Sequence, residues 1–352
     1  MKKVISIALV VMLAISVIAM VGCGNKPETN TGDDAPAATL KFGMGVVASL
    51  GEAKNADGDT NGSGSFAATA VAVLLDADNK IVAIDLDSAD IKNAWTSEGK
   101  VVATEDFATK YEKGADYGMA AYGKKHDGSE GAVKEWFEQA DAFMATAKGK
   151  TLDEVKAMMG EDTYATGDLA TAGCTISVGE FVAALEKAVA NAVDSKATAE
   201  NKLNLAIVSS ATNKDAVEDA AGSVEISSTV VAAVVDAEGK VVVSKTDSVS
   251  GKTTFDAKGV ATVDTKAEIK TKLELGTDYG MSAYGKKHDG SDGKVLEWNE
   301  QAAAFDATLV GKTASDFAAL ADADGYGTGD LATAGCTIGV TDMIAAAAKA
   351  AK

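Results

Sequence analysis

Runs of apolar, mostly β-branched residues alternate along the chain with short polar turns and with segments of helical spacing. Two pairs of apolar runs flank three-residue turns and predict antiparallel hairpins. These strand segments are residues 69–76, 80–87, 229–236 and 240–245. Spaced apolar positions of helical composition predict helices over residues 132–147, 177–193, 294–309 and 339–351. Strands followed by helices predict an α+β fold class, in which helices pack against an antiparallel sheet.

Much of this pattern occurs twice. The segment Asp116–Met119 recurs as Asp278–Met281, so that Tyr279 lies 162 residues after Tyr117. Nine identical residues, Gly167–Thr175 and Gly329–Thr337, are separated by the same offset. A period this long predicts two tandem globular domains rather than a solenoid. We place them at residues 40–194 and 200–352, joined by a short polar segment, and refer to them as the first and second repeat.

The N-terminal segment has the composition of an export signal. Lys2 and Lys3 precede an apolar stretch from Val4 to Val21, which is followed by Gly22 and Cys23. A positive start, an apolar middle and a small residue before the cut predict a cleaved signal peptide over residues 1–22. About eighteen apolar residues are also nearly enough for a retained membrane anchor, which is the alternative.

The ending Met20–Cys23 resembles the lipobox of bacterial lipoproteins. This resemblance implies that Cys23 is diacylated and that cleavage occurs before it. Several acyl chains anchor a protein stably, whereas one chain alone is marginal. Residues 23–39, which contain both prolines of the chain, then form a flexible tether. We therefore expect a lipid-anchored protein on the outer face of the cytoplasmic membrane.

The net charge of the chain limits the kinds of partner that it is expected to bind. The formal net charge is −19, and all 33 basic residues are lysine. Nucleic acid is not expected as a partner because its binding requires a basic face. Contact with the membrane should come through the lipid alone, since the acidic surface repels anionic headgroups. The only two histidines, His126 and His288, leave little material for a transition-metal site, and we expect both in solvated turns.

The repeated nonapeptide is the strongest candidate for chemistry. It ends in Thr175 and Thr337, just before a predicted helix in each repeat. A hydroxyl at a helix N-terminus lies where free N–H groups and the helix dipole favour an anion. Ser177 and Glu180 have capping-box spacing, which predicts that the first of these helices begins near Ser177. Gly173, which lacks a side chain, would allow close approach of another molecule to the backbone.

The order of this motif, an acid followed by small-Gly-small-Thr before a C-terminal helix, resembles the FMN-binding domain family. The other repeated motifs resemble two-domain lipoproteins of the pheromone-lipoprotein type, which are extracellular electron carriers. The resemblance covers both repeats. It implies covalent FMN esterified to Thr175 and Thr337, with Asp168 and Asp330 required for recognition. The chain departs from the family pattern in having Ala-Gly-Cys-Thr and one extra residue after the acid.

The same resemblance implies two partners, namely an FAD-dependent flavin transferase that attaches the FMN and an electron donor on the membrane side. Further residues that it places near the cofactor are Trp136, Trp298, Tyr117, Tyr279, Met119, Met281, Gly173, Gly335, Cys174 and Cys336. The tryptophans either wall the isoalloxazine ring or belong to the core. The Tyr-Gly-Met segments either contact the flavin or form a helix-start turn. We expect the cysteines to be small buried residues rather than redox thiols or a disulfide.

These expectations describe an electron-transfer lipoprotein more than an enzyme with its own substrate, because flavin supplies the redox chemistry and the protein supplies attachment and orientation. Two alternatives stay open at this point. One is a surface lipoprotein without flavin that has a binding or interaction role, and the other is a flavin-dependent extracellular reductase.

Overall fold

The computed structural model describes residues 38–127, 133–288 and 295–352. The signal segment, Cys23 and nearly all of the expected tether lie outside these residues. The described chain combines antiparallel sheets with helices, so the predicted α+β class is confirmed. Within the described ranges, no helix is long and apolar enough to cross a membrane.

The elements occur in two similar series. The first series comprises β1 (Lys41–Leu50), β2 (Gly62–Leu75), β3 (Ile81–Trp95), β4 (Val101–Val102), α1 (Lys110–Lys113), the 3-10 turn η1 (Gly114–Tyr117), α2 (Met119–Asp127), α3 (Trp136–Ala147), α4 (Leu152–Lys156), α5 (Gly167–Ala172), α6 (Gly179–Ala190) and β5 (Val193–Asp194). The second series comprises β6 (Lys202–Lys214), β7 (Gly222–Val235), β8 (Val241–Phe255), β9 (Ala261–Thr262), α7 (Lys272–Leu275), the 3-10 turn η2 (Gly276–Tyr279), α8 (Met281–His288), α9 (Trp298–Leu309), the 3-10 segment η3 (Ala314–Leu320), α10 (Gly329–Thr333) and α11 (Thr341–Ala350).

Each series forms one antiparallel sheet, with strand order β4-β3-β2-β1-β5 in the first and β6-β7-β8-β9 in the second. The central strands β2 and β7 are buried along both faces over most of their length. In β2, for example, Phe66 and Leu74 point to one core, whereas Val71 and Leu75 point to another. This follows from the two-residue period of a strand, which sends successive side chains to opposite faces.

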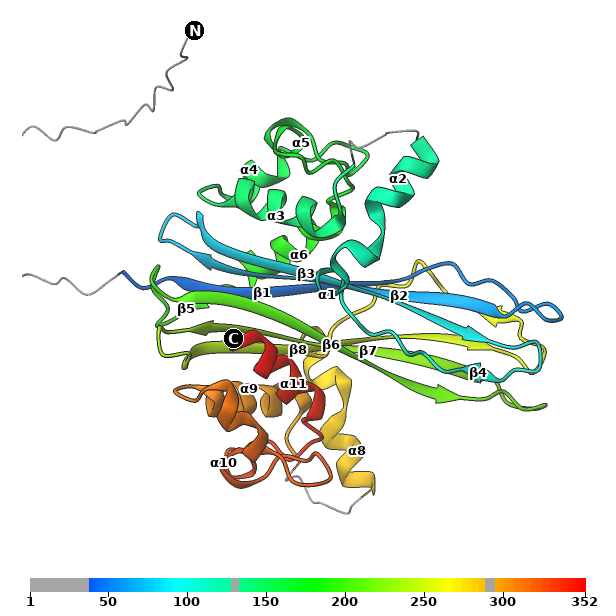
Figure 1. Ribbon diagram of the computed structural model, residues 1–352. Coiled ribbons are helices and arrows are strands. Elements are labelled where there is room, and N and C mark those ends of the chain that lie inside the picture. The colour runs from blue at the N-terminus through cyan, green and yellow to red at the C-terminus, as the bar shows by residue number, and fades with distance from the viewer. Residues whose placement is uncertain (1–37, 128–132, 289–294) are drawn as a thin grey trace, which may run out of the picture. The chain divides into compact units, whose positions relative to one another are not determined.

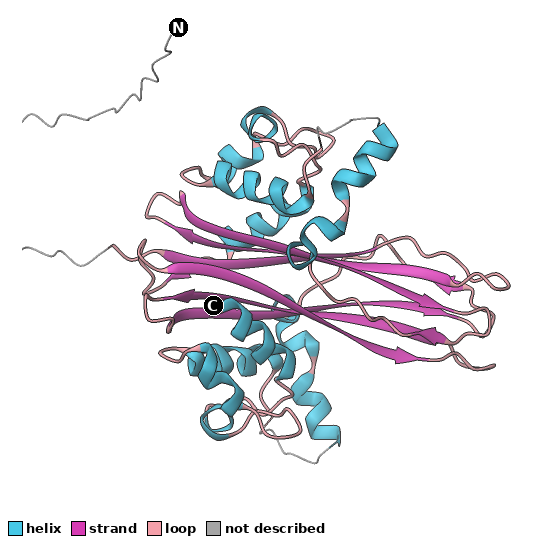
Figure 2. Cartoon of the chain, viewed as in Figure 1, coloured by secondary structure: helices cyan, strands magenta, loops and turns pink. Residues whose placement is uncertain are grey.

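The two sheets pack face to face, and helices cover the outer face of each sheet (Figure 1). Figure 2 shows the resulting layers, with strands between two groups of helices. A core of residues from both repeats fills the space between the sheets, and each helical layer closes a separate core on its own sheet. Residues Ala37–Lys352 accordingly form one compact unit.

Contacts between the repeats are reciprocal. A residue of the first repeat meets one of the second, and their two counterparts meet in turn, as in the interface of a twofold-symmetric dimer. The reciprocal contacts are the ion pairs Lys187–Glu274 and Glu112–Lys349 and the amide bonds from Ala56 to the Gly259 carbonyl and from Ala216 to the Gly99 carbonyl. The packing of the sheets is therefore a paired, self-complementary interface.

The predicted elements are present, but several boundaries differ. The predicted hairpins fall, to within one residue, inside the longer strands β2, β3, β7 and β8, and the strands β1 and β6 were not predicted. The helices predicted over 132–147 and 177–193 begin only at Trp136 and Gly179. The capping box at Ser177 was wrong, because Val178 is the N-cap residue and no side chain caps this helix. Ser177 instead bonds to the Thr163 hydroxyl at 2.7 Å.

Candidate functional site

Thr175 is exposed and lies between the short helix α5 and the longer helix α6. Most of the repeated nonapeptide is thus itself a short helix in each repeat, α5 in the first and α10 in the second. The helix α5 ends at Gly173, whose φ of +95° is a left-handed C-cap. Glycine adopts this conformation without strain. The backbone conformation at the end of α5 is therefore enough to explain a glycine at position 173.

A buried glutamine holds the backbone at Thr175. The Gln139 side-chain oxygen accepts a bond from the Thr175 amide at 2.8 Å and one from the Thr175 hydroxyl at 3.2 Å. The Gln139 amide nitrogen donates to the Lys134 carbonyl at 3.0 Å and to the Met119 sulfur at 3.4 Å. Gln139 is fully buried, and a buried amide with all these partners fixes its neighbours rigidly.

The second repeat builds the same arrangement. The Gln301 oxygen accepts from the Thr337 amide at 2.9 Å, and the Gln301 nitrogen donates to the Leu296 carbonyl and to the Met281 sulfur. Thr337 is exposed, as Thr175 is. Two threonines are therefore presented to solvent on backbone that a buried side chain fixes in the same way.

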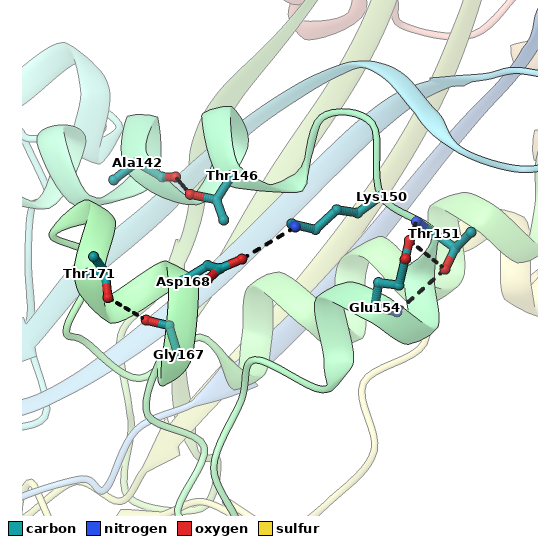
Figure 3. A network of polar contacts seen from close by, with 8 residues as sticks. All are labelled: Ala142, Thr146, Lys150, Thr151, Glu154, Gly167, Asp168 and Thr171. Atoms are coloured by element: carbon teal, nitrogen blue, oxygen red, sulfur yellow. Dashed lines mark hydrogen bonds and ion pairs between the residues drawn. The ribbon is translucent and has the colours of Figure 1, made fainter.

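Asp168 lies in the first turn of α5 and is exposed, with an ion pair to Lys150 at 3.5 Å (Figure 3). Asp330 pairs with Lys312 at 3.4 Å in the same manner. Solvent-exposed ion pairs contribute little to stability. The two acids are therefore available to an approaching macromolecule, and neither bonds to its threonine among the contacts of the described residues.

The cysteines are buried free thiols. Burial raises the pKa of Cys174 and of Cys336 to about 11. A thiol that stays protonated at neutral pH is a poor nucleophile and a poor redox group. Both residues therefore act as small packing residues behind their threonines.

Trp136 and Trp298 are 2% and 3% exposed, so most of each indole belongs to the core. Tyr117 and Tyr279 end the 3-10 turns, and Met119 and Met281 begin the next helices, which is the helix-start interpretation of these segments. In each repeat, the ammonium group of one lysine lies close to both the tyrosine and the tryptophan ring. The Lys272 ammonium lies 5.1 Å from the ring centres of both Tyr279 and Trp298.

In the second repeat this group borders a cavity of about 320 Å³. Its walls include Lys272, Trp298 and Gly339, and Gly339 is only two residues beyond Thr337. Three residues of β7 and β8 that carry hydroxyl groups also line the cavity, namely Ser227, Thr229 and Ser248. A planar group with polar edges fits such walls, because the indole offers an apolar surface and the hydroxyls offer hydrogen bonds.

The corresponding region of the first repeat contains larger side chains. Glu180 stands where the second repeat has Asp342, and its carboxylate accepts bonds from Thr69 at 3.1 Å and Ser49 at 3.4 Å. Phe181 takes the place of Met343. The two repeats therefore share the threonine and its glutamine but differ in the space beside them.

Four residues near the site were not predicted from the sequence, namely Gln139, Gln301, Lys110 and Lys272. The recurrence of Glu-Gln-Ala in both repeats could have identified the two glutamines. The lysines also recur, in Thr-Lys-x-Glu of both repeats, but nothing in the sequence showed that they lie beside the aromatic rings. His126 and His288 lie in α2 and α8 rather than in turns, so that prediction was wrong.

Comparisons with protein-family models, with curated proteins and with solved structures gave no match to this chain.

Proposed function

We propose that this protein is a lipid-anchored, extracytoplasmic electron carrier with FMN esterified to Thr175 and Thr337. The observation that carries the proposal is that each repeat presents one exposed threonine whose amide bonds to a fully or almost fully buried glutamine. An acceptor for a transferase needs an accessible hydroxyl on backbone of fixed geometry. Thr175 and Thr337 meet both needs, and the resemblance of the motif to the FMN-binding domain family adds the identity of the group.

Attachment follows simple chemistry. The threonine oxygen would bond to the FMN-side phosphorus of FAD, AMP would leave with the broken phosphoanhydride oxygen, and the hydroxyl proton would pass to the transferase. Lys134 supplies positive charge near the first acceptor, since its ammonium donates to the Ala172 carbonyl at 3.2 Å. The chain contains no arginine, so lysine side chains and backbone amides are the groups that could bind a phosphate.

The residues around the second acceptor suit a flavin ring. Trp298 and Lys272 would border the ring system, and the hydroxyls of Ser227, Thr229 and Ser248 would meet its polar edge, because they line the adjacent cavity. Bound FMN would supply the one- and two-electron redox chemistry. The chain's own residues hold the threonine in place.

Intact mass of the protein exported by its native host tests this proposal. We expect two additions, each equal to FMN less one water, and a yellow colour that survives denaturation. Thr175→Ala and Thr337→Ala should each remove one addition, whereas Thr171→Ala, which changes another exposed threonine of the same motif, should remove none. Colourless, unmodified protein would overturn the proposal. Steady-state turnover with small acceptors then separates a carrier from a reductase.

A further inference from the structure

A second cavity, of about 390 Å³, lies between the two repeats. The first repeat contributes Gly45 of β1, Lys187 of α6 and Asn191 directly after α6. The second repeat contributes residues of β8, α7 and α9. Its volume is in the range of small-molecule sites, which are about 300–1,000 Å³. The cavity is distinct from the threonine sites, because neither Thr175 nor Thr337 lines it.

Three residues of the second-repeat walls, and Ser244, which bonds to one of them, are polar at positions where the first repeat is apolar. In the first repeat these positions hold Ile84, Leu86, Phe137 and Met144, which pack in or against its helical core. In the second repeat they hold Ser244, Thr246, Asn299 and Asp306. Burial of polar and charged groups costs free energy unless they are paired. A cluster of four such changes at one place indicates a role other than packing.

The cluster has spare hydrogen-bond acceptors. One oxygen of the Asp306 carboxylate accepts the Thr246 hydroxyl at 2.7 Å and the Ser244 hydroxyl at 3.3 Å. The other oxygen accepts only the Thr246 amide, at 3.0 Å, and has room for another donor. The Asn299 side-chain oxygen is buried and has no hydrogen-bond partner among the described residues. Burial raises the pKa of Asp306 to about 6, so this carboxylate is still charged at neutral pH.

Both positive and negative side chains line the cavity. Lys187 and Glu274 neutralise each other in an ion pair of 2.6 Å. Lys245 also lines the cavity and takes part in no ion pair with another described residue. The cavity therefore offers carboxylate and amide oxygens together with one ammonium group that forms no ion pair among the described residues.

We propose that this cavity binds a free α-amino acid, whose ammonium group lies at Asp306 and Asn299 and whose carboxylate lies at Lys245. A zwitterion satisfies both kinds of group at once: its ammonium supplies the donors that the oxygens lack, and its carboxylate supplies the partner of the lysine. The proposal does not depend on flavin, since it concerns other residues.

Isothermal titration calorimetry of the purified full chain with each of the twenty α-amino acids tests this assignment. We expect at least one to bind in a ratio of one per chain and to raise the melting temperature in step with its concentration. Asp306→Asn and Lys245→Met preserve size and should each weaken binding about tenfold or more. Asp219→Asn, an exposed acid elsewhere, should leave the affinity unchanged.

Three outcomes would overturn the proposal. The first is that none of the twenty compounds binds. The second is that Asp306→Asn binds the amino acid as well as the unaltered chain does, while circular dichroism shows both to be folded. The third is that methylammonium or acetate binds as tightly as the amino acid, because either result would mean that the site does not read both ends of a zwitterion.

Discussion

Trp95 and Phe255 stack face to face between the two sheets, with ring centres 4.8 Å apart and planes within 4° of parallel. Trp95 is the last residue of β3 and Phe255 is the last residue of β8, so the two rings occupy equivalent positions. The Trp95 indole also donates to the Gly259 carbonyl of the second repeat at 2.9 Å. This pair therefore links the repeats through packing and through a hydrogen bond.

We expect Phe255→Ala to lower the free energy of unfolding by about 3–5 kcal/mol, because it opens a cavity in a fully buried aromatic contact. Val217→Ala, at a side chain that is 57% exposed, should have little effect. Urea denaturation followed by fluorescence measures both changes. Since the repeats share one core, the described unit should unfold in a single transition; two separate transitions, of which the substitution shifts only one, would contradict the shared core.

The close approach of α6 to β1 makes a second prediction. A Cβ atom at Gly43 would lie 2.0 Å from the Ala188 carbonyl oxygen. Gly43→Ala must therefore push the helix away from the sheet, and we expect it to cost about 1–3 kcal/mol or more of stability. Gly339→Ala is the matched control, because a Cβ there would meet nothing within 4 Å. Equal melting temperatures for the two variants would show that α6 does not lie as close to β1 as described.

The secondary structure was predictable where apolar runs were dense. Of the predicted segment, residues 69–75 form part of β2 because they are mostly apolar on both faces, and this property is visible in the sequence. The second half of β3 was missed, because Asp90, Lys92 and Asn93 make it look polar. Only Ile91 and its neighbours on the inner face are covered, and they are covered by the other sheet. The residue pattern of a strand does not predict which other element will pack on the strand's face.

The residues of the candidate site were likewise predicted only in part. Thr175 and Asp168 were found because a motif repeated, and exposed positions are free to carry such a motif. The lysine between two aromatic rings was not found, since Lys110, Tyr117 and Trp136 come from three separate elements. The polar cavity between the repeats depends on how α6 packs near α9, which no local pattern encodes.

The glutamine beneath each threonine leads to a third prediction. Gln139→Leu removes the acceptor of the Thr175 amide and leaves that amide without its buried partner, which costs about 1–3 kcal/mol. If flavin is attached, we expect the addition at Thr175 to fall severalfold while the addition at Thr337 persists, because Gln301 is unchanged. Peptide mass mapping after proteolysis measures the two sites in one sample. Gln301→Leu should give the opposite pattern, and loss at both sites in either variant would mean that the effect is global unfolding.

Buried carboxyl groups should make the protein less stable as the pH rises toward neutrality. Burial raises the pKa of Asp87 from 3.8 to about 7, and it raises the pKa of Asp247 and of Asp306 to about 6. The folded state therefore holds protons that the unfolded state releases. The stability from each of these groups is fully present below pH 3.8 and is lost as the pH rises through the folded-state pKa.

We expect the free energy of unfolding to fall between about pH 4 and pH 7 for this reason. Asp87→Asn keeps the side-chain oxygen that accepts the Ser88 amide at 2.7 Å but cannot ionise, so it should flatten this fall and stabilise the protein at pH 7.5 by about 2 kcal/mol. Asp59→Asn, at an exposed position, should leave the slope unchanged. Denaturant titrations at pH 4.5, 6.0 and 7.5 measure the slope. A steeper fall in Asp87→Asn than in the unaltered chain would mean that Asp87 stabilises the fold as a charged group, with its pKa lowered rather than raised.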